Sequence, residues 1–383
     1  MKKVILTLVF AVFTAFVFAQ APSSGGGDSD ENCSSCFDIE QRSDSCDPEI
    51  RIPPIYCPTD LWAALLSGSS YSQIHQEGDD GVADVTQTGS NVSVIFQYGD
   101  DSSFWNNLAV VDQSDGINFS LITQDGDGNW AFVTQSGEYN LSDVNQIGMD
   151  NTADVNQMDT HNKSDVDQLG DYNNATVTQK DCFNKAKIFQ CGDDNIASVD
   201  QSGNYNVACV KQVGDYHIAD VVQEGEENLA KTTQQGYANW AGQDQLGDEN
   251  KAYIDQYGAI NDAYQTQVGD RNYAEAYQDG DFNRIDQLQT GDDNEALAVQ
   301  LGDGNLATQT QTGDANKAIS LQYGMDGTTI SDQSGDANGS LIIQGGSYNL
   351  ADVMQAGGNQ ASVIYQNVMA PGGGNSAYVS QTK

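Results

Sequence analysis

The chain has 383 residues, of which 55 are acidic and 15 are basic, and its formal net charge is −40. A charge of this size argues against nucleic-acid binding, because that function needs a basic surface that displaces counterions from phosphates. The three histidines leave few candidates for a histidine-based metal site or for general acid–base catalysis.

Residues 1–19 are predicted to be a secretory signal peptide. They begin with Lys2 and Lys3, continue as an apolar run, and end in the small-residue pattern of Val17 and Ala19. The alternative is a transmembrane anchor, but the run is short, and no later segment approaches the roughly 20 apolar residues that a span needs. Removal of the two lysines takes the net charge from −40 to −42. We therefore expect a secreted, strongly acidic chain without a transmembrane segment.

Residues 20–69 form a predicted leader that is rich in cysteine, proline and glycine. Four of the seven cysteines lie here, and three lie later in the chain: Cys33, Cys36, Cys46 and Cys57, then Cys182, Cys191 and Cys209. In an exported chain we expect disulfides. The Cys-x-x-Cys spacing of Cys33 and Cys36 also fits a metal site, and the odd total leaves one thiol free or paired between chains.

Residues 70–383 consist of a single repeat. Every eleventh residue from Gln113 to Gln366 is glutamine, and four more glutamines continue the pattern outward across two short insertions, Gln76, Gln87, Gln97 and Gln381. The unit reads Gln-x-Gly-x-x-Asn-x-Ala-x-Val-x. Such a fixed period is the signature of stacked structural units.

The pattern inside each unit predicts a β-strand. Asn, Ala, Val and Gln alternate with other residues, and a period of two places them on one face of a strand. A period of eleven also fits a right-handed helical supercoil, but glycine in nearly every unit would cost about 1 kcal/mol per position in a helix. We expect a strand of about seven residues and a four-residue turn. Asp115, Asp159 and Asp181 replace the repeat glycine, and aspartate tolerates the left-handed backbone of such a turn.

In the second half of the repeat, the residue two positions before the repeat glutamine alternates in type from unit to unit, which predicts two strands per coil. Gln243, Gln265, Gln287 and Gln309 are spaced by 22, and the units between them carry Ile, Ala, Ala and Ser at that position. The predicted fold is therefore all-β, a two-sheet β-solenoid of about 14 coils with 22 residues per coil. At a strand spacing of about 4.8 Å, the stack would be roughly 65 to 70 Å tall.

Stacked coils place identical amides above one another, so the repeat asparagines and glutamines are the predicted ladder and assembly residues. In the first part of the repeat they are Gln113, Asn118, Gln124, Asn129, Gln135, Asn140, Gln146 and Asn151. Further along they are Gln245, Asn250, Gln256, Asn261, Gln267, Asn272, Asn375 and Gln381.

The units QSGEYNLSDVNQ (135–146) and QCGDDNIASVDQ (190–201) resemble the curlin repeat of curli fibre subunits. The resemblance extends over residues 70–383. It implies a left-handed β-solenoid and an extracellular functional amyloid with roles in biofilm matrix and adhesion. It also implies export through an outer-membrane pore, a nucleator subunit as a partner, and a cell-surface location.

The end of the repeat independently predicts self-assembly. The last predicted strand, Asn375 to Gln381, lies two residues from the end of the sequence, so its edge would stay unpaired and could pair with a second copy. Head-to-tail addition of this kind produces a filament. The alternative is a monomeric secreted β-solenoid that binds cations, glycans or ice. We expect no enzyme and no cofactor, because the insertion with Asp100, Asp101 and Trp105 has no histidine nearby.

One column of acidic residues is a weaker candidate for a metal site. Asp248, Asp270, Asp292, Asp314 and Asp336 are spaced by 22, so the coils would bring their carboxylates together. Carboxylates about 4.8 Å apart repel one another. They are either solvated and screened by salt, or bridged by cations such as Ca²⁺.

Overall fold

The computed structural model describes residues 69–78, 81–99, 106–366 and 374–382. Every regular element in these ranges is a β-strand. The predicted signal peptide, all of the predicted leader except Ser69, and the insertion residues Asp100, Asp101 and Trp105 lie outside them. No helix in these ranges is long and apolar enough to cross a membrane.

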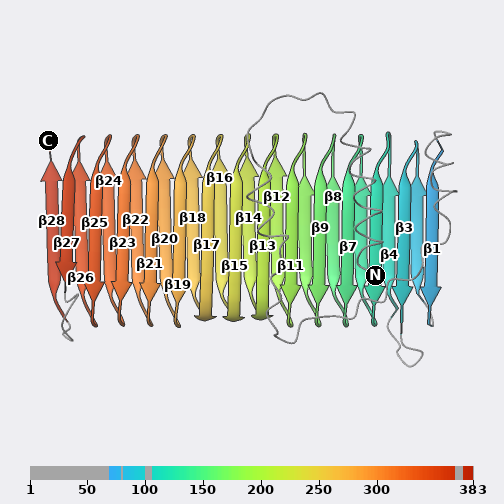
Figure 1. Cartoon of the computed structure of the whole chain (residues 1–383), viewed down its shortest axis with the longest axis horizontal. Coiled ribbons are helices and arrows are strands. Elements are labelled where there is room, and N and C mark those ends of the chain that lie inside the picture. Colours follow the sequence, from blue (N-terminus) through green and yellow to red (C-terminus); the bar gives the residue numbers. More distant parts are fainter. Residues whose placement is uncertain (1–68, 79–80, 100–105, 367–373, 383) are drawn as a thin grey trace, which may run out of the picture.

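The strands form two parallel sheets, and successive strands alternate between them (Figure 1). The first sheet holds the odd-numbered strands β1 (Tyr71–Glu77), β3 (Val92–Tyr98), β5 (Phe119–Asp125), β7 (Leu141–Ile147), β9 (Lys163–Leu169), β11 (Lys185–Cys191), β13 (Val207–Asp215), β15 (Leu229–Tyr237), β17 (Lys251–Ala259), β19 (Tyr273–Asp279), β21 (Glu295–Leu301), β23 (Lys317–Tyr323), β25 (Gly339–Gly345) and β27 (Ala361–Gln366).

The second sheet holds the even-numbered strands β2 (Val82–Gln87), β4 (Leu108–Gln113), β6 (Trp130–Gln135), β8 (Thr152–Gln157), β10 (Asn174–Gln179), β12 (Ile196–Ser202), β14 (Ile218–Glu224), β16 (Trp240–Leu246), β18 (Asp262–Val268), β20 (Arg284–Thr290), β22 (Leu306–Thr312), β24 (Thr328–Ser334), β26 (Leu350–Ala356) and β28 (Ser376–Thr382). Each sheet therefore has 14 strands. One odd and one even strand make a coil, which confirms the predicted two-sheet solenoid of about 14 coils.

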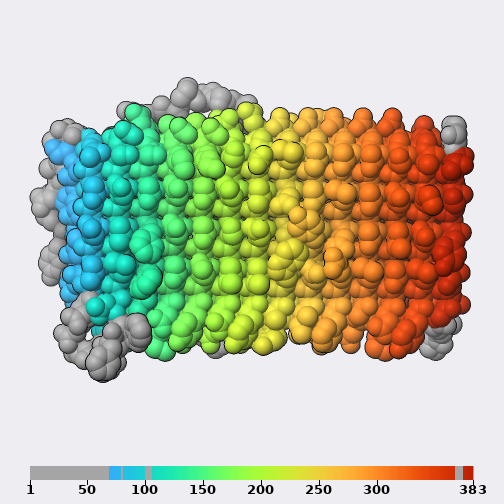
Figure 2. All heavy atoms as spheres, turned by 180° about the vertical axis from the view of Figure 1, so that it is seen from behind, coloured from blue at the N-terminus to red at the C-terminus, as the bar shows by residue number. Residues whose placement is uncertain are grey.

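The register between coils keeps like residues above like. Gln168 of β9 pairs with Gln190 of β11, and Val177 of β10 pairs with Val199 of β12. Along most interior strands, buried and more exposed residues alternate, and the Asn, Ala, Val and Gln positions of the repeat point inward. Strand β3 is an exception, because its residues Val92 to Gln97 are all buried. The outward residues form straight rows along the stack (Figure 2).

The turns explain the repeat glycine. Gly247 has φ +121°, and a Cβ added there would lie 2.2 Å from the carbonyl oxygen of Gly269 in the next coil. Neither the left-handed backbone nor the close approach suits a side chain. Asp115, Asp159 and Asp181 take the same backbone at φ 67–74°, as predicted. A second left-handed residue follows two positions later in most turns, such as Glu249 at φ 58°, and the repeat pattern gave no sign of it.

Candidate assembly interface

Two glutamine ladders run through the whole stack, one in each sheet. In every rung, Nε2 of one glutamine donates to Oε1 of the glutamine in the next coil. The odd-strand ladder begins with Gln76 to Gln97 at 2.6 Å and ends with Gln344 to Gln366 at 2.8 Å. The even-strand ladder includes Gln113 to Gln135 at 2.6 Å and ends with Gln355 to Gln381 at 2.9 Å. All predicted ladder glutamines belong to one or other of these columns.

The same amides also tie the two sheets together. The second N–H of Gln124 in β5 donates to the backbone carbonyl of Leu108 in β4 at 3.0 Å. Gln267 in β18 does the same to Lys251 in β17 at 3.1 Å. Because both amide protons and the carbonyl oxygen have partners, these buried side chains carry no desolvation penalty for unpaired groups.

The repeat asparagines bond mainly to the main chain rather than to one another. The Oδ1 atom of Asn118 accepts the backbone N–H of Asn140 at 3.0 Å, and its Nδ2 donates to the carbonyl of Gly137 at 2.9 Å. Direct amide-to-amide bonds occur only in some coils, such as Asn151 to Asn129 at 3.0 Å. The side chain therefore caps the turn of the next coil, which differs from the amide ladder expected from the sequence.

His217 shows which part of asparagine the turn requires. It replaces asparagine in the repeat, and its Nδ1 accepts the backbone N–H of Asn239 at 3.2 Å. Its Nε2 lies 3.2 Å from the carbonyl of Val213, so the neutral ring with the proton on Nε2 satisfies both contacts. Burial lowers the pKa of His217, which favours this neutral form.

A third amide ladder fills the middle of the core in the second half of the stack. Gln243, Gln265, Gln287 and Gln309 are buried and bond in sequence, with Gln243 to Gln265 at 3.0 Å. The ladder ends on hydroxyl groups, because Thr232 donates to Gln243 at 2.9 Å and Gln309 donates to Ser320 at 3.1 Å. Each amide also reaches the backbone of the opposite sheet, as Gln265 does at Tyr253. At this position the odd-numbered strands β19, β21 and β23 carry the small buried residues Ala276, Ala298 and Ser320, which leave room for the amides.

The acidic column lies on the upper edge, which we define as the turns after the even-numbered strands. Oδ1 of Asp270 accepts the backbone N–H of Asp248 at 3.0 Å, and Asp292 does the same for Asp270 at 3.0 Å. Asp314 and Asp336 continue the series. In the part of the chain that the structure describes, no group of three or more metal-ligating side chains could hold a metal ion. The hydrogen bonds give these carboxylates a structural role that the spacing alone did not reveal.

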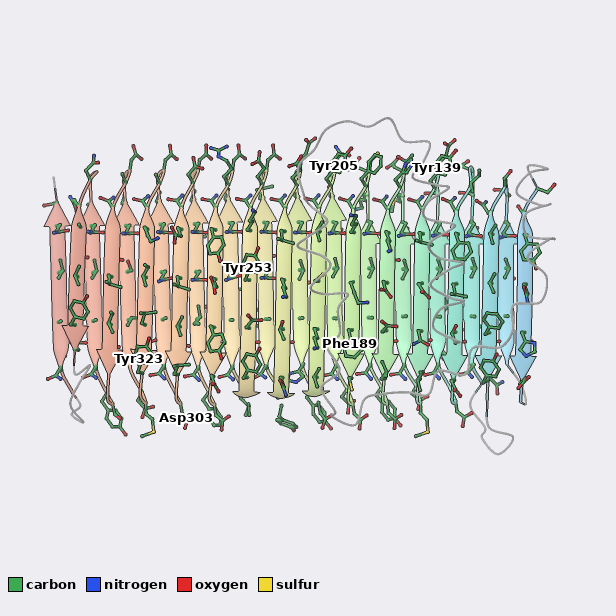
Figure 3. The ribbon with its side chains drawn as sticks, viewed as in Figure 1. Tyr139, Phe189, Tyr205, Tyr253, Asp303 and Tyr323 are labelled. Atoms are coloured by element: carbon green, nitrogen blue, oxygen red, sulfur yellow. The ribbon has the colours of Figure 1, made fainter. Side chains whose placement is uncertain are left out.

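An aromatic column lies further along the same upper edge (Figure 3). The rings of Tyr139, His161, Phe183 and Tyr205 follow one another with centroid distances of 5.0, 4.6 and 4.9 Å. Each occupies the second left-handed turn position, where its backbone projects the ring outward. The spacing of 22 between these residues was the signal in the sequence, and the sequence analysis missed it.

A charged cluster lies on the outward face of the odd-strand sheet. Nζ of Lys187 in β11 lies 2.8 Å from Asp165 and 3.7 Å from Asp167, both in β9. Burial, followed by the nearby charge of Asp165, raises the pKa of Asp167 to about 6. The same causes hold the pKa of Asp143 well above its usual range. The sequence analysis did not anticipate these contacts.

The end coils differ from every interior coil. At the N-terminal end, the Ile74 side chain is 45% exposed, whereas Ile95, one coil further in, is 0% exposed. Within the described ranges, β1 and β27 form the two edges of one sheet, and β2 and β28 form those of the other. The predicted residues Asn375 and Gln381 both belong to the last coil, where Asn375 contacts Asn349 and Gln381 contacts Gln355.

Comparison with known proteins agrees with this repeat. The sequence profile of the family described as Curlin associated repeat matches residues 118–148, 148–180, 192–225 and 225–258. A search of curated proteins finds no match. The four matched segments lie inside a series of units that continues on both sides, with the same strand order and the same glutamine ladders. The chain therefore contains curlin-associated repeats.

Proposed function

We propose that the chain is the structural subunit of an extracellular, curli-like amyloid fibre that grows by head-to-tail addition of strands. The observation that carries this proposal is the open core at both ends of the solenoid. Ile74 at one end and Ala377, Val379 and Gln381 at the other keep part of their surface exposed, although the equivalent residues of interior coils are buried. Such coils gain free energy when a further coil covers them.

The strand edges support the same conclusion. The outer edges of β27 and β28 pair with no strand of the described chain, and their backbone groups are spaced for another parallel strand. Because the two ends of the solenoid are different surfaces, addition of one copy to the next does not close into a ring. The result is a filament with strands perpendicular to its axis, the arrangement known as cross-β.

The location and role follow from the family to which the repeat belongs. A secreted fibre at the cell surface, acting in biofilm matrix and adhesion, is the function that a curli-like subunit would perform. Its partners would be further copies of itself, an outer-membrane export pore and a nucleator subunit. The high negative charge fits this role, because self-repulsion keeps an exported chain soluble before it assembles.

Seeded growth of the purified mature chain tests the proposal. We expect fibres by electron microscopy, a diffraction spacing of about 4.8 Å along the fibre axis, and faster growth after addition of fibre fragments. Ile74→Asp, which places a carboxylate on the open core, should slow growth. Gln73→Asp places the same charge on the outward face of the same strand and is the matched control. A chain that stays monomeric and does not respond to seeds would contradict the proposal and favour a monomeric β-solenoid that binds cations, glycans or ice.

A further inference from the structure

The glutamine ladders have a direction. In each rung the glutamine nearer the N-terminus donates from Nε2, and the glutamine in the following coil accepts at Oε1. The ladders therefore end differently at the two ends of the stack. Gln366 and Gln381 each donate one N–H to a backbone carbonyl, at 3.0 and 3.1 Å, and no described residue accepts the second N–H that continues the ladder in all the other coils. At the other end, no described residue donates to Oε1 of Gln76 or Gln87, so these atoms are ready acceptors.

The core residues of the two ends also match. If β27 meets β1 of a second copy, and β28 meets β2, in the register used inside the chain, six inward positions come together. At all six the two residues are of the same type: Ser362 with Ser72, Ile364 with Ile74, Gln366 with Gln76, Ala377 with Ala83, Val379 with Val85, and Gln381 with Gln87.

Coils near both ends share this set of inward residues, as β5 with β6 and β25 with β26 do, but coils in the middle of the stack do not. The interior strands β17 and β18 carry Ala252 and Ile254, and Ala263 and Gln265, at the corresponding inward positions. Placed against β1 and β2, Gln265 would leave its amide beside Val85 without an amide partner. An unpaired buried polar group costs about 1 to 3 kcal/mol, so the outermost coils are better partners for one another than for the middle of the stack.

We propose that the fibre junction is this register-matched pairing: β27 on β1 and β28 on β2 of a second copy, with Gln366 donating to Gln76 and Gln381 donating to Gln87. The inference rests on the proposed fibre function and adds the partner surface and its register. It also gives the fibre a single polarity. Joining two C-terminal ends would place amide donors against donors, and joining two N-terminal ends would place acceptors against acceptors.

The junction brings defined outward residues of two molecules together. Val363 would lie beside Gln73, and Ser380 beside Thr86, with Cα atoms about 4.8 Å apart. Within one chain, Val363 pairs with Leu341 and Gln73 with Val94, and Ser380 pairs with Met354 and Thr86 with Asp112. A lysine at position 363 or 380 would therefore have no acidic partner directly opposite it in its own chain.

Zero-length cross-linking of fibres tests the register. The full mature chain is prepared with Val363→Lys and Gln73→Glu, and separately with Ser380→Lys and Thr86→Glu on the other sheet. Fibres grown from mixed isotope-labelled and unlabelled chains are treated with a carbodiimide, and mass spectrometry locates amide bonds between chains. We expect links 363–73 and 380–86. The crossed control, Val363→Lys with Thr86→Glu, should lose the link because its two positions lie on different sheets.

The outcomes separate the register from the fibre itself. If the unmodified chain forms no fibres, the proposed function fails. If it forms fibres but both matched pairs give no link, or the crossed control links equally well, the register is wrong while the fibre function stands. If the unmodified chain forms fibres and both matched variants do not, the register is also contradicted, because opposite charges placed side by side should support the junction.

Discussion

The first and second halves of the stack fill the same core position with different chemistry. From β4 to β14, the even-numbered strands place valine at the middle of the core, and one apolar cluster runs from Ile95 to Ala230. From β16 to β22, the same position holds Gln243, Gln265, Gln287 and Gln309, and the apolar cluster there is much smaller. The backbone is the same in both halves. A coil therefore accepts either side chain. Where the glutamine series ends, beside Val221 and beside Ser331, the hydroxyl groups of Thr232 and Ser320 pair with the terminal amides.

The upper edge changes at nearly the same place. The aromatic column Tyr139–Tyr205 lies beside the apolar-cored coils, whereas the acidic column Asp248–Asp336 lies beside the amide-cored coils and continues past them. Both columns follow from the same rule, since stacking brings residues 22 apart into contact whether their interaction is favourable or not. Substitutions in the two halves therefore measure separately what an apolar ladder and a polar ladder contribute to stability.

Placing an amide in the apolar half should have the largest effect. In Val177→Gln the new amide would lie between Val155 and Val199, which offer it no hydrogen bond, and it is larger than the valine that it replaces. An unpaired buried polar group and overpacking each cost about 1 to 3 kcal/mol. We expect a loss of about 2 to 6 kcal/mol in the free energy of unfolding, measured by denaturant titration. A loss below 1 kcal/mol would show that the two halves are not chemically distinct.

The reverse substitution in the amide half should reduce the free energy of unfolding by less. The size of the loss should depend on the residues at the same position in the neighbouring coils. Gln265→Val leaves an N–H of Gln243 and the Oε1 of Gln287 without partners, so we expect a loss of about 2 to 3 kcal/mol. Replacing all four glutamines of this ladder by valine removes most unpaired groups at once. The loss per substitution should then fall below that of the single variant. Equal losses per residue would contradict a ladder that acts as a unit.

The comparison also shows what the sequence could predict. The period of eleven, the alternation within each unit and the spacing of Gln243 and Gln265 led to the strands, the two sheets and the coil of 22 residues. These features depend on local patterning, and each repeat adds to the same signal. The positions of Gly247 and Asp115 in left-handed turns followed from the limited set of residues that tolerate such a backbone.

Other features depend on contacts between coils that no single unit contains. The bond from Asn118 to the turn of the next coil, and the contact of Lys187 with Asp165, require the actual geometry of stacked turns and faces. The left-handed backbone at Glu249 or Tyr172 has no sequence preference behind it, because the hydrogen bonds of the neighbouring coils impose it. The assembly role of the ladder residues remains a proposal for the experiments described above.

His217 lies in the turn between β13 and β14, one coil before the first amide-cored strand β16, and it should make stability depend on pH. Its folded pKa is lowered from the usual value near 6.5, so the unfolded chain binds the proton more tightly. Its contribution is then fully present above about pH 6.5 and is lost as the pH falls through the folded pKa. His217→Asn restores the repeat residue and should remove this dependence. Denaturant titrations of both proteins between pH 7.5 and about 5 provide the measurement. If the difference in the free energy of unfolding between the two proteins is the same at every pH, stability does not require the neutral form of the His217 ring.

Substitutions in the acidic column should have the smallest effect. They test how much the two halves of the stack differ at their upper edges. Oδ1 of Asp292 already accepts a backbone N–H, and an asparagine at this position could accept the same bond. In a variant with Asp270→Asn, Asp292→Asn and Asp314→Asn we therefore expect the same fold and slightly faster fibre growth at low salt, because repulsion between the carboxylates is removed. The difference should disappear near physiological salt, where the screening length is about 8 Å. Millimolar Ca²⁺ should speed growth of the unmodified chain no more than a sodium salt of equal ionic strength. A calcium-specific acceleration that the triple variant loses would instead show that cations bridge the column and that the acidic edge is a binding site.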